Sequence, residues 1–155
     1  MSDFVFRLIR SAPFESAPPD QFFLVSGPVA LLTHGQALVR HHGIDYARQL
    51  AKSFSSKRTF YIVKQNNVVI NFGTLTLGVC RYYPVEPTAV VIGSCWTADA
   101  HRGRGLATSA IRAAMNCMIS KGSSLFYIDT QANNTAMLRS IEKLGFGNPI
   151  KRSTK

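Results

Sequence analysis

The residues best suited to chemistry lie between Val90 and Ala107. Residues 90–97 form an apolar, β-branched run of the kind found in strands. A turn at 98–101 follows, and then Arg-Gly-Arg-Gly-Leu-Ala at 102–107. Beyond Gly105, small and apolar residues recur at helical spacing. The glycines therefore stand where a strand ends and a helix begins.

A junction of this kind can bind phosphate. The first turn of a helix has unpaired backbone N–H groups and the positive end of the helix dipole, and glycine lets an anion approach the backbone closely. The third glycine of the dinucleotide-binding fingerprint is missing, and so is the Gly-Lys-Ser/Thr of the P-loop. A plain turn is the alternative interpretation, because glycine also serves simply to permit tight turns.

This loop and a later motif resemble the GNAT superfamily of N-acetyltransferases. Arg102, Gly105 and Ala107 match the superfamily's R/Q-x-x-G-x-G/A signature. The stretch 134–146 opens with Asn and closes with Gly-Phe, as the superfamily's final motif does. The resemblance covers residues 58–147, and the segment before it is only generally compatible.

The resemblance implies an α+β fold. Its mixed central sheet would have about six strands flanked by about four helices, with two splayed central strands that hold coenzyme A. Acetyl-coenzyme A would be the acyl donor, and a small-molecule or peptide amine the acceptor. At 155 residues the whole chain, 1–155, is expected to form one such domain. Residues 1–57 would supply the first strand and acceptor-side helices or loops.

Several cofactor contacts are implied by the resemblance. Thr97 and its neighbours would pair with the pantetheine arm, and the backbone of the loop would take the pyrophosphate. Asn134 would donate a hydrogen bond to the cofactor arm, or simply cap the last helix. The two loop arginines would add charge at the phosphates, although exposed arginines are ordinarily solvated surface. The loop residues are Arg102, Gly103, Arg104, Gly105, Leu106 and Ala107.

An amine acceptor must lose a proton before it attacks. A lysine-like amine is neutral about once in two to three thousand molecules at pH 7, a penalty of about 4.6 kcal/mol. Asp129 lies five residues before Asn134, where some relatives carry a Glu used as a base. Burial would raise the pKa of Asp129 toward a useful value. A hydrogen-bonded structural Asp is the alternative role, and Glu86 is the second candidate base.

Many relatives place a Tyr in the final helix to protonate the departing thiolate. Ile141 occupies that position here. The missing Tyr, together with the ending Arg-Ser-Ile-Glu-Lys-Leu-Gly-Phe at 139–146, resembles the branch of the superfamily that acts on ribosomal-protein N-termini and amino sugars. Tyr127 could substitute or could belong to the core. A thiol with a pKa near 8.5 leaves without help, so catalysis does not depend on such a Tyr. Cys95 lacks an identifiable activating partner and is interpreted as a core residue.

The supporting elements follow from periodicity and turn residues. We expect a strand at 3–10, a hairpin with arms 59–65 and 68–80 around Asn66-Asn67, a helix at 106–121 and a strand at 125–131. Gly73 and Gly78 predict a bulge or close backbone approach. A helix should begin at Asp45, and another follows Asn134. Residues 22–38 could form short helices or a loop.

The tail after Phe146 leaves room for less than the two strands with which the superfamily usually ends. The last strand is expected to be missing, truncated or supplied by another chain. Because an uncovered sheet edge invites pairing, this pattern predicts a homodimer.

Composition bounds the function further. A net charge of +10 favours anionic ligands such as the phosphates of coenzyme A. Nucleic acid is disfavoured, because the basic residues are scattered rather than clustered. Three separated cysteines and His41-His42 predict neither a disulfide framework nor a metal site. The sequence has no long apolar run and no recognisable signal segment, so we expect a cytoplasmic protein without a membrane span.

Two classes of function remain open. The first is an N-acyltransferase that transfers acetyl directly to an amine, with an amino sugar enclosed by residues 22–42 or a peptide, including a protein N-terminus, in a groove on the same side. The second is a module that binds coenzyme A without turnover.

Overall fold

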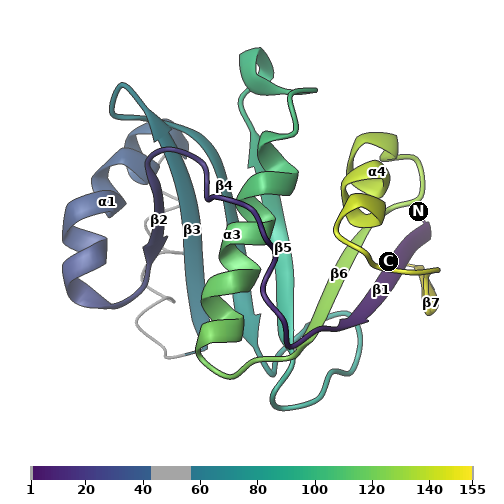
Figure 1. Cartoon of the computed structure of the whole chain (residues 1–155). Coiled ribbons are helices and arrows are strands. Elements are labelled where there is room, and N and C mark those ends of the chain that lie inside the picture. Colours follow the sequence, from purple (N-terminus) through teal and green to yellow (C-terminus); the bar gives the residue numbers. More distant parts are fainter. Residues whose placement is uncertain (1, 43–56, 155) are drawn as a thin grey trace.

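The protein is described by a computed structural model that covers residues 2–42 and 57–154. One seven-stranded sheet forms its centre (Figure 1). The strands are β1 (Ser2–Ile9), β2 (Phe22–Val25), β3 (Arg58–Gln65), β4 (Val68–Leu77), β5 (Val90–Thr97), β6 (Leu125–Gln131) and β7 (Lys151–Thr154). The helices are α1 (Gly27–His42), the 3-10 helix η2 (Asp99–His101), α3 (Leu106–Ser120) and α4 (Thr135–Lys143).

The sheet has the order β2-β3-β4-β5-β6-β1-β7. Only β5 and β6 pair in parallel, and their pairing stops at Ile92 opposite Ile128. Both strands continue beyond this point, to Thr97 and Gln131, and they diverge (Figure 1). The expected mixed sheet with splayed central strands is therefore confirmed.

A bulge interrupts β5 on its other side. Gly93 pairs with Thr74 of β4 and Trp96 pairs with Phe72, so Ser94 and Cys95 together lie opposite a single residue. Ser94 has a left-handed φ of 50°, a conformation that non-glycine residues adopt uncommonly. The second half of β5 is thus irregular on the side of β4 and unpaired on the side of β6.

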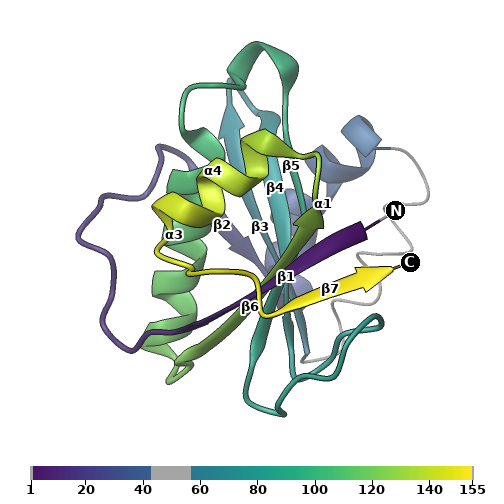
Figure 2. The same cartoon turned by 90° about the vertical axis from the view of Figure 1, so that its right-hand side faces the viewer.

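The two faces of the sheet are covered differently. Since strand side chains alternate between faces, Tyr61, Ile92 and Ile128 pack against α3 and α4 in one core cluster. On the opposite face, Phe60 and Ile62 pack near α1, and Tyr83 from the loop 78–89 packs on β1, β5 and β6. Figure 2 shows α4 and α3 on one side of the strands.

The predicted hairpin is confirmed. Asn66 and Asn67 both have left-handed φ, 49° and 63°, as a two-residue hairpin turn requires. Gly73 is a position of close approach, because the Tyr61 ring occupies the space that a Cβ would need. The helix ended by Gly122 and the strand before Asn134 also agree with their predicted bounds to within a residue.

The structure resolves two segments that the sequence left open. Residues 22–38, which the sequence left undecided, form β2 and most of α1, with Pro28 in the first turn where its missing N–H is tolerated. After Phe146 the chain forms β7, which pairs antiparallel with β1. The sheet therefore has seven strands rather than about six.

Other expectations are outside what this structure tests. The helix expected from Asp45 lies outside the described residues, and the homodimer stays a prediction. No helix in the two described ranges is both long and apolar enough to cross a membrane.

Candidate active site

Two pockets meet where β5 and β6 diverge. The first, here called the loop pocket, encloses about 540 Å³ between the end of β5, the loop 101–107 and α4. The second, the sheet pocket, encloses about 840 Å³ and extends across β3 to β6 and β1. Both are lined by Cys95, Asn134 and Met137, which we call the seam. The two pockets therefore adjoin at these three residues.

The loop pocket is built to receive an anion. Gly105, with a φ of 77°, is the N-cap of α3 and provides no side-chain cap, so the N–H groups of the first turn keep their donor capacity. Arg102, Arg139 and Lys143 line the same pocket, and none of its described lining residues is a carboxylate. Helix dipole and side-chain charges therefore act in the same direction.

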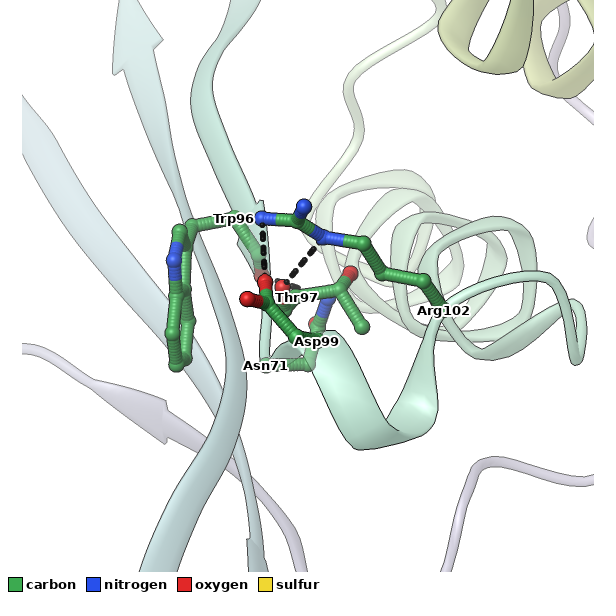
Figure 3. A network of polar contacts seen from close by, with 5 residues as sticks. All are labelled: Asn71, Trp96, Thr97, Asp99 and Arg102. Atoms are coloured by element: carbon green, nitrogen blue, oxygen red, sulfur yellow. Dashed lines mark hydrogen bonds and ion pairs between the residues drawn. The ribbon is translucent and has the colours of Figure 1, made fainter.

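The Arg102 side chain links the loop 101–107 to the end of β5. Its Nε donates to the carbonyl oxygen of Thr97 at 3.0 Å, and its Nη2 contacts Oδ1 of Asp99 at 2.9 Å. Figure 3 shows the guanidinium folded back over the end of β5. Part of the charge that was expected to act on phosphate is thus offset by Asp99.

Asn71 of the neighbouring strand β4 holds the same end of β5 through side-chain hydrogen bonds. Its side chain is fully buried, and Nδ2 donates to the carbonyl oxygen of Trp96 at 2.8 Å and to Oγ1 of Thr97 at 2.9 Å (Figure 3). Phe72 stacks on the Trp96 ring, with centroids 5.6 Å apart. Sequence reasoning missed Asn71, although a polar residue inside the apolar run of β4 was an available signal.

We expect Asn71→Ala to lower the free energy of unfolding by about 1–3 kcal/mol, because it leaves two partly buried acceptors, the carbonyl oxygen of Trp96 and Oγ1 of Thr97, without their donor. It should also weaken ligand binding in the loop pocket, since the end of β5 loses its support. Asn116→Ala is the matched control: Asn116 makes two hydrogen bonds to the backbone of Phe14, at 2.7 and 3.0 Å, and lines neither pocket. Thermal unfolding and calorimetric titration of both variants separate the effects; equal binding losses would contradict the proposed role of Asn71.

The structure gathers most of the predicted cofactor residues. Asn134 lies at the seam, where its Oδ1 also accepts from the N–H of Met137 at 3.1 Å, so it does cap α4. Arg104 is separate and lines a small hollow with Pro19 and Ser109. The predicted residues that line the loop pocket are Thr97, Arg102, Gly103, Gly105, Leu106, Ala107 and Asn134.

Asp129 lies in the sheet pocket, on the strand β6 that borders the split. The hydroxyl of Tyr83 donates to its Oδ1 at 3.5 Å. Burial, with the nearby Asp129 charge and Cys80 adding to it, raises the pKa of Tyr83 far above its ordinary value. Tyr83 therefore remains a neutral hydrogen-bond donor beside the carboxylate.

Glu86 and Tyr127 lie elsewhere. The Tyr127 hydroxyl donates to Glu86 at 2.8 Å, and Arg7 forms an ion pair with the same carboxylate at 3.2 Å. The hydrogen bond from Tyr127, supported by Arg7, lowers the pKa of Glu86. Neither residue lines either pocket. Ile141 is 1% exposed and belongs to the core under α4, so it contributes no proton donor.

Cys95 does not resemble a nucleophile. Its Sγ is 3.3 Å from the Tyr61 hydroxyl, and burial raises the pKa of the thiol to about 11. A thiol with that pKa is protonated at neutral pH, whereas nucleophilic cysteines react as thiolates. Within the described ranges, no three His, Cys, Asp or Glu side chains gather as a metal site would require.

Residues 30–146, about three quarters of the sequence, match the model of the acetyltransferase (GNAT) family. The chain belongs to this family. The match contains both motifs and the split strands that carry the two pockets. A comparison with curated proteins finds no significant match.

Solved structures share the fold of this acetyltransferase-family chain. A GNAT-family acetyltransferase from Novosphingobium aromaticivorans superposes with a TM-score of 0.64 at 21% identity, covering 99% of this chain and 62% of the other. A GCN5-related N-acetyltransferase from Sphaerobacter thermophilus gives 0.69 at 13% identity, covering 98% and 50%. AAC(6')-Iy, in complex with the bisubstrate analogue CoA-S-monomethyl-acetylneamine, gives 0.65 at 19% identity, covering 84% and 93%. The chain thus spans less than two thirds of the first of these structures.

Proposed function

We propose that the protein is an acetyl-coenzyme A dependent N-acyltransferase that transfers acetyl directly to a primary amine. The observation that carries the proposal is the seam: a pocket built for phosphates and a pocket containing a carboxylate meet at Cys95, Asn134 and Met137. Direct transfer needs donor and acceptor to be in contact, and the adjoining pockets support such contact.

The loop pocket holds the donor. The N–H groups at the start of α3 bind the pyrophosphate, and Arg139 and Lys143 add positive charge from α4. The second half of β5, which does not pair with β6 and is supported by Asn71 and Arg102, offers its β6-facing edge to the pantetheine arm. The thioester then lies at the seam.

The sheet pocket prepares the acceptor. Asp129 accepts the proton that the ammonium must lose, and the Tyr83 hydroxyl orients the carboxylate. The bulge at Ser94 and Cys95 leaves backbone without a register partner in β4, and N–H groups there stabilise the oxyanion as it forms. Glu86 is not required, because it lines neither pocket.

One observation favours a second candidate, a module that binds coenzyme A without turnover. Ile141 is buried where many relatives carry a proton-donating Tyr. A coenzyme A thiolate is nevertheless a good leaving group, with a thiol pKa of about 8.5. Complexes of AAC(6')-Iy with coenzyme A and with a bisubstrate analogue support acyl transfer on this fold.

Binding and turnover distinguish the candidates. Acetyl-coenzyme A should bind at one site and stabilise the protein by about 2.7 kcal/mol at a hundred times its Kd. Release of free thiol should then depend on an acceptor, tested with amino sugars, peptide N-termini, polyamines and lysine peptides. No binding at near-millimolar cofactor would refute the proposal, whereas binding without any acceptor-dependent thiol release would establish the second candidate.

A further inference from the structure

The charges of the sheet pocket are separated. Arg58, Thr76, Val91 and Tyr127 lie in one row across β3, β4, β5 and β6, because each pairs with the next. Asp129 is two residues beyond Tyr127 and therefore on the same face. The floor of the pocket thus runs from a guanidinium on β3 to a carboxylate on β6.

Two further charged residues line the pocket. Arg81, which follows β4, is one of them, and its guanidinium lies 6.0 Å from the centre of the Tyr82 ring. Asp3 of β1 lines it on the side of Asp129, and is 3% exposed. Among the described residues, neither arginine forms an ion pair with a carboxylate. Both guanidinium groups line the pocket without a described carboxylate at ion-pair distance.

We propose that the acceptor is dipolar and carries an anionic group, a carboxylate or a phosphate, besides the amine that is acetylated. The inference rests on the proposed function, which puts the amine beside Asp129 in the sheet pocket. Arg58 and Arg81 then bind the anionic group, since guanidinium groups recognise carboxylate and phosphate through paired hydrogen bonds. A polycationic acceptor would instead leave a positive group against these arginines.

The dimensions fit a short molecule. Neighbouring strands are about 4.8 Å apart, so β3 and β6, three spacings apart, are separated by about 14 Å where all four strands pair. Asp129 lies just beyond the last pair of β5 and β6, where the separation is larger. An extended tripeptide spans about 10 Å from amine to carboxylate, and the long Arg58 side chain, which lines the pocket, can cover the remainder.

Matched acceptors test the inference. Trialanine with a free carboxylate and trialanine amide differ only in the anionic group, and spermidine provides an acceptor with cationic groups alone. Binding is measured by calorimetry in the presence of coenzyme A, which cannot react, and turnover with acetyl-coenzyme A. The free acid should bind about 10- to 100-fold more tightly than the amide, as one charge-assisted hydrogen bond allows.

The arginines should account for that preference. Arg58→Gln and Arg81→Gln should each bring the ratio of affinities toward one. Lys121→Gln, which removes the same charge from an exposed residue outside both pockets, should leave it unchanged.

Equal affinity for acid and amide, tighter binding of spermidine, or no binding of any of the three would overturn the inference while the acyltransferase proposal stands. Failure of coenzyme A itself to bind would refute the proposed function first.

Discussion

Gly105→Val is expected to weaken acetyl-coenzyme A binding by at least about 10- to 100-fold, the equivalent of one charge-assisted hydrogen bond at the phosphates. Apart from the adjoining residues of the chain, no protein atom lies within 4 Å of the position that a Cβ would take, so the valine side chain would extend toward the ligand. Its branched side chain would also strain a residue with a φ of 77°. Calorimetric titration measures the loss.

The control for strain is at the other end of the same helix. Gly122 has a φ of 92°, also has open space around it, and lines neither pocket. Gly122→Val should lower the melting temperature as Gly105→Val does but leave cofactor affinity at the parental value. If a folded Gly105→Val protein bound acetyl-coenzyme A normally, the loop would be a turn and nothing more.

Asp129→Asn should lower turnover by about 10²- to 10⁴-fold, which is the usual contribution of a general base. It should preserve cofactor affinity. The amide keeps the shape of the carboxylate but cannot accept the proton. The defect should shrink as pH rises, because a larger fraction of the amine is then neutral without help. Steady-state rates between neutral and alkaline pH measure this change.

Glu86→Gln is the matched control, since it makes the same chemical change in a carboxylate that lines neither pocket. It should keep the parental turnover at every pH. If Asp129→Asn lost cofactor binding or had a lowered melting temperature, Asp129 would instead have a structural role. Parental turnover in Asp129→Asn would place the base elsewhere or assign the step to water.

The loop pocket was the more predictable part of the site because its main residues are contiguous. Residues 102–107 follow a strand and begin a helix, so local chemistry alone indicates an anion site. Arg139 and Lys143 could not be predicted to line this pocket, because their place depends on how α4 lies against the diverging strands β5 and β6. No local sequence pattern specifies that arrangement. The interaction of Arg102 with Asp99, three residues away, was also not anticipated.

The sheet pocket could not be predicted in the same way. Its charged residues, Asp3, Arg58, Arg81 and Asp129, come from four separate segments and meet only through the order of the strands. Sequence reasoning nominated Asp129 by resemblance and Glu86 by its neighbours, and nothing local distinguished them. The distinction came from the Tyr127 and Arg7 contacts, which bridge 41 and 79 residues.

The two pockets meet where β5 and β6 diverge, and they lie mainly on opposite faces of the sheet. The loop pocket lies on the side of α3 and α4, whereas Arg58, Val91 and Asp129 belong to the opposite face. In the proposed reaction, spent coenzyme A departs on one side of the molecule and the acetylated product on the other. If neither product has to pass the other, we expect that they can be released in either order.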